Sequence, residues 1–144
     1  MTTNSDSKLP KNGVPIDDAE NWTKAWQTKY PSHSKAFLIP NTDLLSLLEE
    51  IGVLVSDGKG GLVVHSNPAV YGIRAYMAIG PDRITGEEEE KLVMVGTVDV
   101  KGEFQDQVKN SKDEPQVPLS GSGAFDFGRP CPKTCNVNSS LYHN

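Results

Sequence analysis

The chain has 144 residues, of which 36% are hydrophobic, and its mean hydropathy of −0.44 lies at the polar end of the range for globular proteins. This length predicts one domain that can bury a hydrophobic core without metal ions or disulfides. A net charge of −5 argues against nucleic acid and anionic membranes as partners, because both bind concentrated Lys and Arg side chains.

The start of the chain lacks the features of a sorting signal. Residues 1–14 have neither the basic start nor the apolar stretch of a secretory signal, and no apolar run approaches the roughly 20 residues that span a membrane. A cytoplasmic location is therefore expected. In that reducing compartment the two cysteines should be thiols, unless they bind a metal or take part in redox chemistry. Residues 1–14 also lack a periodic apolar pattern, which predicts a disordered arm.

A first helix is predicted between Pro15 and Pro31. Asp17 and Glu20 have the spacing of a capping box at its start. One face is apolar and largely aromatic, which predicts that it packs in the core: Ala19, Trp22, Trp26 and Tyr30. The polar side chains of the helix would then face outward: Glu20, Lys24 and Gln27.

A second helix is predicted from Asn41 or Thr42, either of which can cap it, to Gly52. Its apolar face needs a sheet or another helix to cover it: Leu44, Leu45, Leu47, Leu48 and Ile51. Residues 53–64 then predict a β-hairpin with a glycine-rich turn. A phosphate-binding loop is excluded there, because no Gly-Lys-Ser/Thr ending and no helix follow the glycines.

Residues 71–80 and 91–100 are the most strongly patterned part of the chain, and they predict two paired neighbouring strands. The acidic residues 81–90 between them predict a solvated loop. Both strands are largely apolar on both faces, which predicts central strands of a sheet that is covered at least partly on both sides.

Arg74 is the one charged side chain in the first of these strands. If Ile79 pairs with Leu92, Arg74 lies opposite Thr97 and diagonal to Asp99. One hypothesis is therefore a partly buried ion pair between Arg74 and Asp99. The alternative is an Arg74 side chain that extends to water without a partner.

These elements predict an α+β fold in which two N-terminal helices pack on a small, mainly antiparallel sheet, with an extended C-terminal arm. The α+β domain would span residues 15–110, followed by a linker or loop at residues 111–123 and the arm at residues 124–144. Phe125 and Phe127 would point the same way and hold the arm to the domain.

The arm carries the chemically distinctive residues. Cys131 and Cys135 are separated by three residues, one more than in the usual redox motif. Three interpretations remain open: inert structural cysteines, a zinc site that would need further ligands such as His143, and a thiol pair that cycles to a disulfide. In the last case Arg129 is a nearby cation that would lower a thiol pKa. The Asp126-Phe127-Gly128 run is not taken as a kinase magnesium motif, because no nucleotide-binding loop precedes it.

Several of these motifs together resemble a group of small uncharacterised proteins of Bacteroidota-type bacteria. The motifs are Gly72-Ile73-Arg74-Ala75-Tyr76, the strand Leu92–Gly96 leading to Asp99 and Gly102, and Asp126-Phe127-Gly128 with Cys131-Pro132 and Cys135. The resemblance covers roughly residues 35–136, and Lys133 stands where members of the group often have a second proline. It implies fold boundaries, and no activity, cofactor or substrate comes with it.

The expected function is a non-enzymatic protein-interaction or binding module that associates with itself, for example as a homodimer, and needs no cofactor. The candidate functional surface comprises Arg74, Tyr76, Asp99, Asp126 and Arg129. The alternative is a thiol- or zinc-dependent function built on Cys131 and Cys135, with His143 as a candidate ligand. A weaker alternative is a small-molecule site on the face of Arg74, Tyr76 and Asp99.

Overall fold

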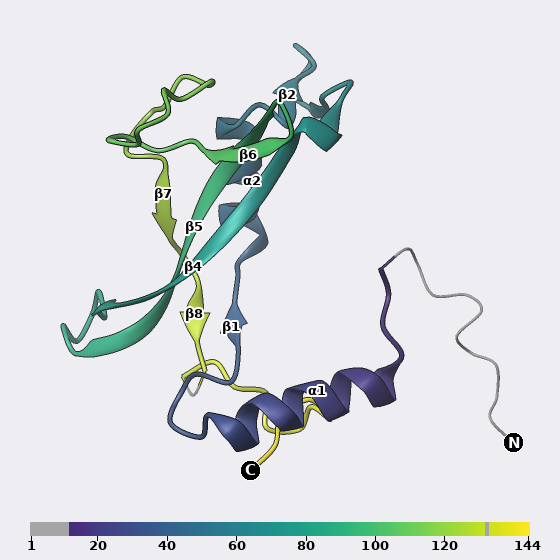
Figure 1. The fold of residues 1–144 in the computed structure, drawn as a ribbon, viewed down its shortest axis with the longest axis vertical. Helices are drawn as coiled ribbons and strands as arrows, with labels where there is room; N and C mark the ends of the chain where they lie inside the picture. The colour runs from purple at the N-terminus through teal and green to yellow at the C-terminus, as the bar shows by residue number, and fades with distance from the viewer. Residues whose placement is uncertain (1–11, 132) are drawn as a thin grey trace, which may run out of the picture. The chain divides into compact units, whose positions relative to one another are not determined.

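The computed structural model describes residues 12–131 and 133–144. The chain forms two compact units: one contains the described residues up to Ala36 and those from Pro130 onward, and the other is Phe37–Arg129. The fold is α+β, as predicted, with two α-helices in the described part and mainly antiparallel strand pairing (Figure 1). Among the described residues, no helix is long and apolar enough to cross a membrane.

A long antiparallel hairpin forms the centre of the Phe37–Arg129 unit (Figure 1). It consists of β4 (Tyr71–Pro81) and β5 (Glu88–Val100), and it confirms the predicted strand pair. Two shorter strands, β6 (Glu103–Asp106) and β7 (Ala124–Asp126), also pair antiparallel with β5. β5 therefore lies between β4 on one edge and β6 and β7 on the other.

The register of this hairpin differs by two residues from the predicted one. Ile79 lies opposite Glu90 and not opposite Leu92. The glutamates at positions 88–90 belong to β5, so the connection is confined to residues 82–87. Asp82 stabilises that turn, because its Oδ1 accepts hydrogen bonds from the main-chain N–H groups of the residues two and three positions further on.

The core of this unit lies where α2 (Asn41–Glu50) covers β5. Leu47 and Ile51, at the end of the helix, are buried together with Met94 of β5. Gly96 permits this close approach, because an added Cβ would overlap Cγ2 of Ile51. Partly buried side chains from other segments complete the cluster: Ile39, Val53, Tyr71, Leu92, Phe125 and Phe127. The two phenylalanines hold their segment to this core, as predicted.

Several short elements complete this unit. The predicted glycine-turn hairpin is confirmed as β2 (Leu54–Ser56) and β3 (Leu62–Val64), and a short 3₁₀ helix, η2 (Pro68–Val70), precedes β4. β1 (Phe37–Leu38) pairs with β8 (Arg129–Pro130), of which only Arg129 belongs to this unit.

Residues 107–123 contain no helix or strand, but a buried glutamine anchors this stretch. Gln107 is 1% exposed, its N–H donates to the carbonyl of Gly96 at 2.9 Å, and its Oε1 accepts from the N–H of Gln116 at 2.6 Å. The loop is therefore tied to β5 at its start.

The other unit consists of α1 (Ile16–Lys29) and the C-terminal residues. Trp22 is 62% exposed and Trp26 43%, so the prediction that this aromatic face is core is wrong. Gln27, predicted to face outward, is instead only 7% exposed. The reason is that its side-chain amide binds main-chain groups of Leu141 and His143, which a helical periodicity cannot reveal.

The predicted helix caps are also wrong. In α1 and α2 the N-cap residues are Pro15 and Pro40, and neither makes a side-chain capping hydrogen bond. Each helix begins directly after its proline, so Asp17 lies inside the first turn of α1 and Asn41 is the first helical residue of α2. The acidic side chains there still interact favourably with the helix dipole.

Candidate functional site

The outer edge of β4 is the candidate functional surface. Among the described strands, only β5 is hydrogen-bonded to β4. The other edge of β4, which is 11 residues long, therefore has no partner among these strands. Natural edge strands are usually short or protected by charges, prolines or bulges. β4 is long and carries one charged residue, Arg74, with its proline at the very end. Its main chain is therefore a template to which another strand can pair.

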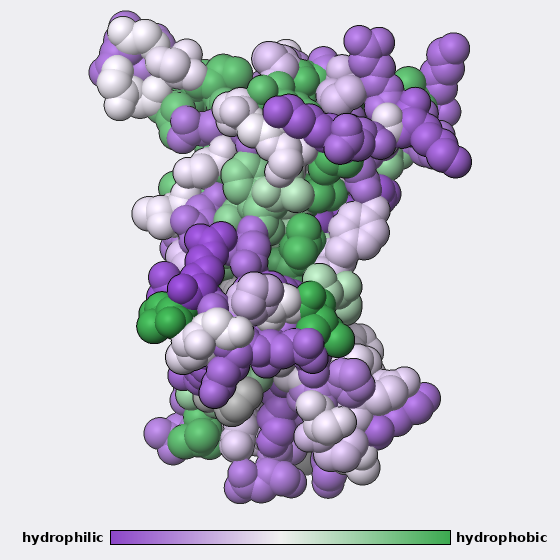
Figure 2. Space-filling model, turned by 90° about the vertical axis from the view of Figure 1, so that its left-hand side faces the viewer, coloured by the Kyte–Doolittle hydropathy of each residue, from purple (hydrophilic) through white to green (hydrophobic). Residues whose placement is uncertain are grey.

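One face of this edge is apolar and exposed. Ile73 is 37% exposed, Met77 59% and Ile79 69%. They share a face with Ala75, which lies opposite the buried Met94 of β5. The apolar face of the sheet therefore continues beyond the part that α2 covers, out to the free edge. Figure 2 shows, on the face it draws, hydrophobic side chains that reach the surface among polar ones.

The other face of β4 carries a polar cluster around Asp106. Arg74 Nη1 donates to Asp106 Oδ1, and the Tyr76 hydroxyl donates to Oδ2 of the same carboxylate. Arg74 Nη2 also donates to the carbonyl of Phe104 at 3.1 Å. Interaction with Tyr76, followed by the charge of Asp106, raises the pKa of the Arg74 guanidinium. The cluster joins β4 to β6 across the intervening β5.

The predicted ion pair between Arg74 and Asp99 is wrong. Arg74 lies opposite Val95, which is two residues from the predicted register, and Asp106 takes the place of Asp99. Asp99 instead accepts the N–H of Gly102 at 2.7 Å and so closes the turn between β5 and β6. Sequence reasoning missed Asp106 because no strand was predicted after residue 100. The Lys-Gly pair at 101–102 between two extended runs is a hairpin signal that would have found it.

Asp126 belongs to a different ion-pair network. Its Oδ2 accepts from Lys91 Nζ at 2.9 Å, and its carbonyl accepts from Arg83 Nη2 at 2.9 Å. Glu89 is a second partner of Lys91, at 3.3 Å. The hydrogen bond that Lys91 donates to Asp126, and with it the one to Glu89, raises the pKa of Lys91, although the partial burial of the ammonium opposes this. These contacts hold β7 and the β4–β5 turn to β5, so the geometry gives Asp126 a structural role.

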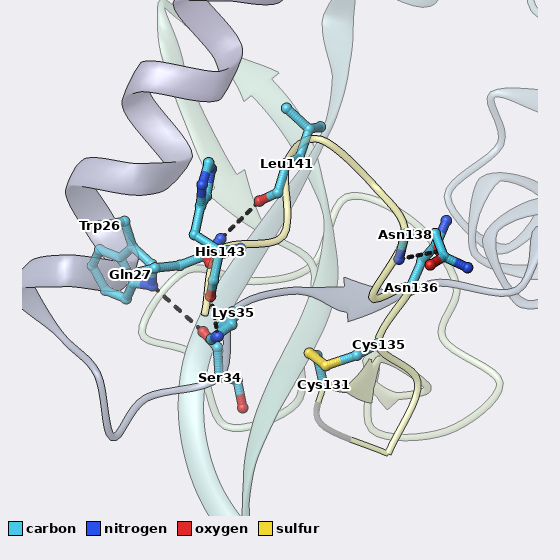
Figure 3. The surroundings of a disulfide bond; sticks show 10 residues. All are labelled: Trp26, Gln27, Ser34, Lys35, Cys131, Cys135, Asn136, Asn138, Leu141 and His143. Atoms are coloured by element: carbon cyan, nitrogen blue, oxygen red, sulfur yellow. Dashed lines mark hydrogen bonds between the residues drawn. A yellow bond between two sulfur atoms is a disulfide. The ribbon is translucent and has the colours of Figure 1, made fainter.

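The two cysteines form a disulfide with each other (Figure 3). Cys131 is 3% exposed and Cys135 is half-buried. His143 has a different contact: its Nε2 lies 3.1 Å from Thr23 Oγ1 of α1. Within residues 12–131 and 133–144, no three His, Cys, Asp or Glu side chains are grouped so that they could hold a metal ion. Arg129, the remaining candidate, lies in the short strand β8.

Comparisons of the chain with protein-family models, with curated proteins and with solved structures find no match. Its function therefore has to be inferred from its own residues. Of the sequence-predicted candidates, the structure brings Arg74 and Tyr76 together on β4, whereas Asp99 and Asp126 each have other partners.

Proposed function

We propose that this chain is a non-enzymatic protein-interaction module that associates with a second copy of itself through the free edge of β4. The observation that carries the proposal is the 11-residue edge strand with one charged residue and exposed apolar side chains. Addition of a strand to such an edge supplies main-chain hydrogen bonds, and the alternating side chains provide specificity.

A second copy is the occupant that fits best, because β4 is complementary to itself in an antiparallel arrangement. Tyr76 is the central residue of Tyr71–Pro81, so full overlap of two copies places the two Tyr76 residues opposite each other. Ile73 then lies opposite Ile79 of the second copy, on the apolar face. A two-fold interface of this kind uses the same patch on both partners.

The charges of β4 also permit this pairing. In the fully overlapped register Arg74 lies opposite Ala78 of the second copy, so the two guanidinium groups do not face each other. Each Arg74 keeps its own Asp106 as partner. A strand edge is a small interface compared with the about 1,200–2,000 Å² of stable complexes. We therefore expect a concentration-dependent dimer and not a permanent one.

Analytical ultracentrifugation over a range of concentrations tests the proposal. Met77→Lys places a charge on the apolar face of the edge, where the two copies of residue 77 are diagonal neighbours, and should shift the protein to monomer. Ile84→Lys is the matched control, because Ile84 is 96% exposed in the β4–β5 turn and its replacement adds the same charge away from the edge. A monomeric unmodified chain at all concentrations would contradict the proposal, as would equal dissociation of both variants.

The second candidate is a thiol-dependent function at Cys131 and Cys135. The disulfide between them favours this form over the zinc site, since the sulfur atoms are bonded to each other. Metal analysis of the purified protein, together with thiol titration, separates the two. Stoichiometric zinc would support the zinc site, and a metal-free disulfide that is reduced and formed again reversibly would support the thiol function.

Other expectations from the sequence remain part of the proposal. The acidic composition supports a protein partner in place of nucleic acid or a membrane, and no cofactor is invoked. A cytoplasmic location, the resemblance to the small Bacteroidota-type family and the packing of α1 on the sheet also remain predictions.

A further inference from the structure

The C-terminal residues 136–144 lie against α1, and one side chain makes the principal contacts (Figure 3). Gln27 Nε2 donates to the carbonyl of Leu141 at 2.9 Å, and Gln27 Oε1 accepts from the N–H of His143 at 2.8 Å. Both functional groups of the Gln27 amide are thus satisfied by the main chain of the segment. This pairing explains why Gln27 is the buried residue of α1.

Two further side chains hold the end of the segment. Lys35 Nζ donates to the carbonyl of His143 and lies 4.2 Å from the ring centroid of Tyr142. Thr23 Oγ1 of α1 shares a hydrogen bond with His143 Nε2. All of these contacts are polar or involve a cation.

The disulfide fixes the point at which this segment begins. The N–H of Cys131 donates to the carbonyl of Ala36 at 2.8 Å, and the disulfide then joins Cys131 to Cys135, with a Cα–Cα distance of 4.7 Å. Cys135 directly precedes the segment. A cross-link here limits the positions that the unbound segment can sample and so favours its bound state.

We propose that the Cys131–Cys135 disulfide is a thiol-reversible lock on the C-terminal segment. In the oxidised form the segment stays bound to α1. In the reduced form it is released, and Gln27 becomes accessible to solvent.

Glutathione is the thiol reductant that the proposed cytoplasmic location would supply. Its thiolate attacks Sγ of Cys135, the more exposed cysteine, to form a mixed disulfide, and Cys131 leaves as a thiolate. A second glutathione thiolate attacks the glutathione sulfur of the mixed disulfide, which releases the Cys135 thiolate and oxidised glutathione. The protein gains two electrons, two glutathione molecules lose them, and the two protein thiolates take up the two protons.

Amide hydrogen exchange of the full chain, in reduced and in oxidised glutathione buffers, tests this lock. Thiol alkylation with mass spectrometry measures the oxidised fraction in the same samples. Exchange in residues 136–144 and at the side-chain amide of Gln27 should become roughly ten- to thirtyfold faster on reduction, the effect expected when a short cross-linked loop is opened. Exchange in β5 should not change, which would show that the sheet remains folded.

Two variants make the test decisive. The double variant Cys131→Ser with Cys135→Ser should exchange like the reduced protein in both buffers. Gln27→Ala keeps the disulfide but removes the two side-chain hydrogen bonds to Leu141 and His143, so the segment should exchange faster even when oxidised. Thr28→Ala at an exposed neighbouring position should behave like the unmodified chain. Equal exchange of the segment in the oxidised and reduced protein would overturn the proposal, as would a disulfide that glutathione does not reduce.

Discussion

A single carboxylate, Asp106, connects the two outer strands of the sheet around β5. The carboxylate accepts hydrogen bonds from Arg74 and from Tyr76, both on β4, and Asp106 itself is the last residue of β6. The Asp106 side chain is 18% exposed and that of Arg74 42%, so water screens the pair in part. Its contribution to stability should therefore be that of a partly exposed ion pair.

Asp106→Asn tests this assignment. The substitution removes the charge but keeps the shape, and we expect the free energy of unfolding to fall by about 0.5–1 kcal/mol. Asp99→Asn is the matched control, because an Asn side chain can still accept the N–H of Gly102, and we expect almost no change. Urea unfolding measures both variants. A loss with Asp99→Asn equal to that with Asp106→Asn would show that the assigned partner of Arg74 is wrong.

The pH dependence of stability tests the role of Lys91, which is 8% exposed between Asp126 and Glu89. Its pKa is raised above the ordinary value of 10.5, so protonated Lys91 favours the folded state. The stabilisation is complete below the ordinary pKa and is lost as the pH rises through the higher folded pKa.

We therefore expect Lys91→Met to lower the free energy of unfolding by about 1 kcal/mol near neutral pH. Measured from neutral pH to above pH 10.5, the difference from the unmodified chain should stay constant at first and then shrink once the pH passes the ordinary pKa of 10.5. Lys112→Met, at an exposed position of the 107–123 loop, should show no such trend. A difference for Lys91→Met that stays constant across this range would contradict the assignment.

At the scale of elements, the contact between α2 and β5 depends on a glycine, Gly96, which has no side chain. Gly96→Ala would place a Cβ against Cγ2 of Ile51, a member of the core cluster at the end of the helix. Overpacking of this kind costs about 1–3 kcal/mol. Thermal or urea unfolding should show that loss, whereas Gly121→Ala, with open space around it in the loop, should leave stability nearly unchanged.

A second substitution identifies the physical cause. Ile51→Leu removes the Cγ2 methyl, so it should restore part of the stability in the Gly96→Ala background while costing some on its own. If Gly96→Ala proved neutral, the close packing of α2 on β5 would be refuted.

The elements that the sequence predicts correctly are those whose signals are local. The β2–β3 hairpin follows from its glycine turn, and the central strands from their apolar residues. The register was predicted wrongly because the glutamates at 88–90 resemble a loop, although cross-strand pairing keeps them in β5. The burial of Gln27 depends on partners more than 100 residues away in sequence, and no local pattern contains that information.

The exposure of the candidate surface, by contrast, could not be predicted from local sequence signals. Exposure of the β4 edge depends on which strands pair with it, and that is a property of the whole sheet. The alternation of the strand predicted its two faces, but the apolar residues on both suggested a covered central strand. In the structure β4 is an edge strand, and its apolar face is partly exposed.

At the scale of the whole molecule, each unit has one feature that links structure to function. The Phe37–Arg129 unit presents the β4 edge, on which the proposed self-association depends. The other unit contains the disulfide and the C-terminal segment, on which the proposed redox lock depends. The two proposals can therefore fail independently, since Met77→Lys leaves the cysteines unchanged and the double Cys→Ser variant leaves β4 unchanged.

Amide hydrogen exchange in β4 at low and high protein concentration tests the central claim most directly. If two copies pair through this edge, the outward N–H groups of β4 become hydrogen-bonded in the dimer. We predict that exchange in residues 71–81 slows at high concentration, while exchange in the β2–β3 hairpin stays the same. Exchange in β4 that does not depend on concentration, over a range in which ultracentrifugation detects a dimer, would place the interface elsewhere and contradict the proposal.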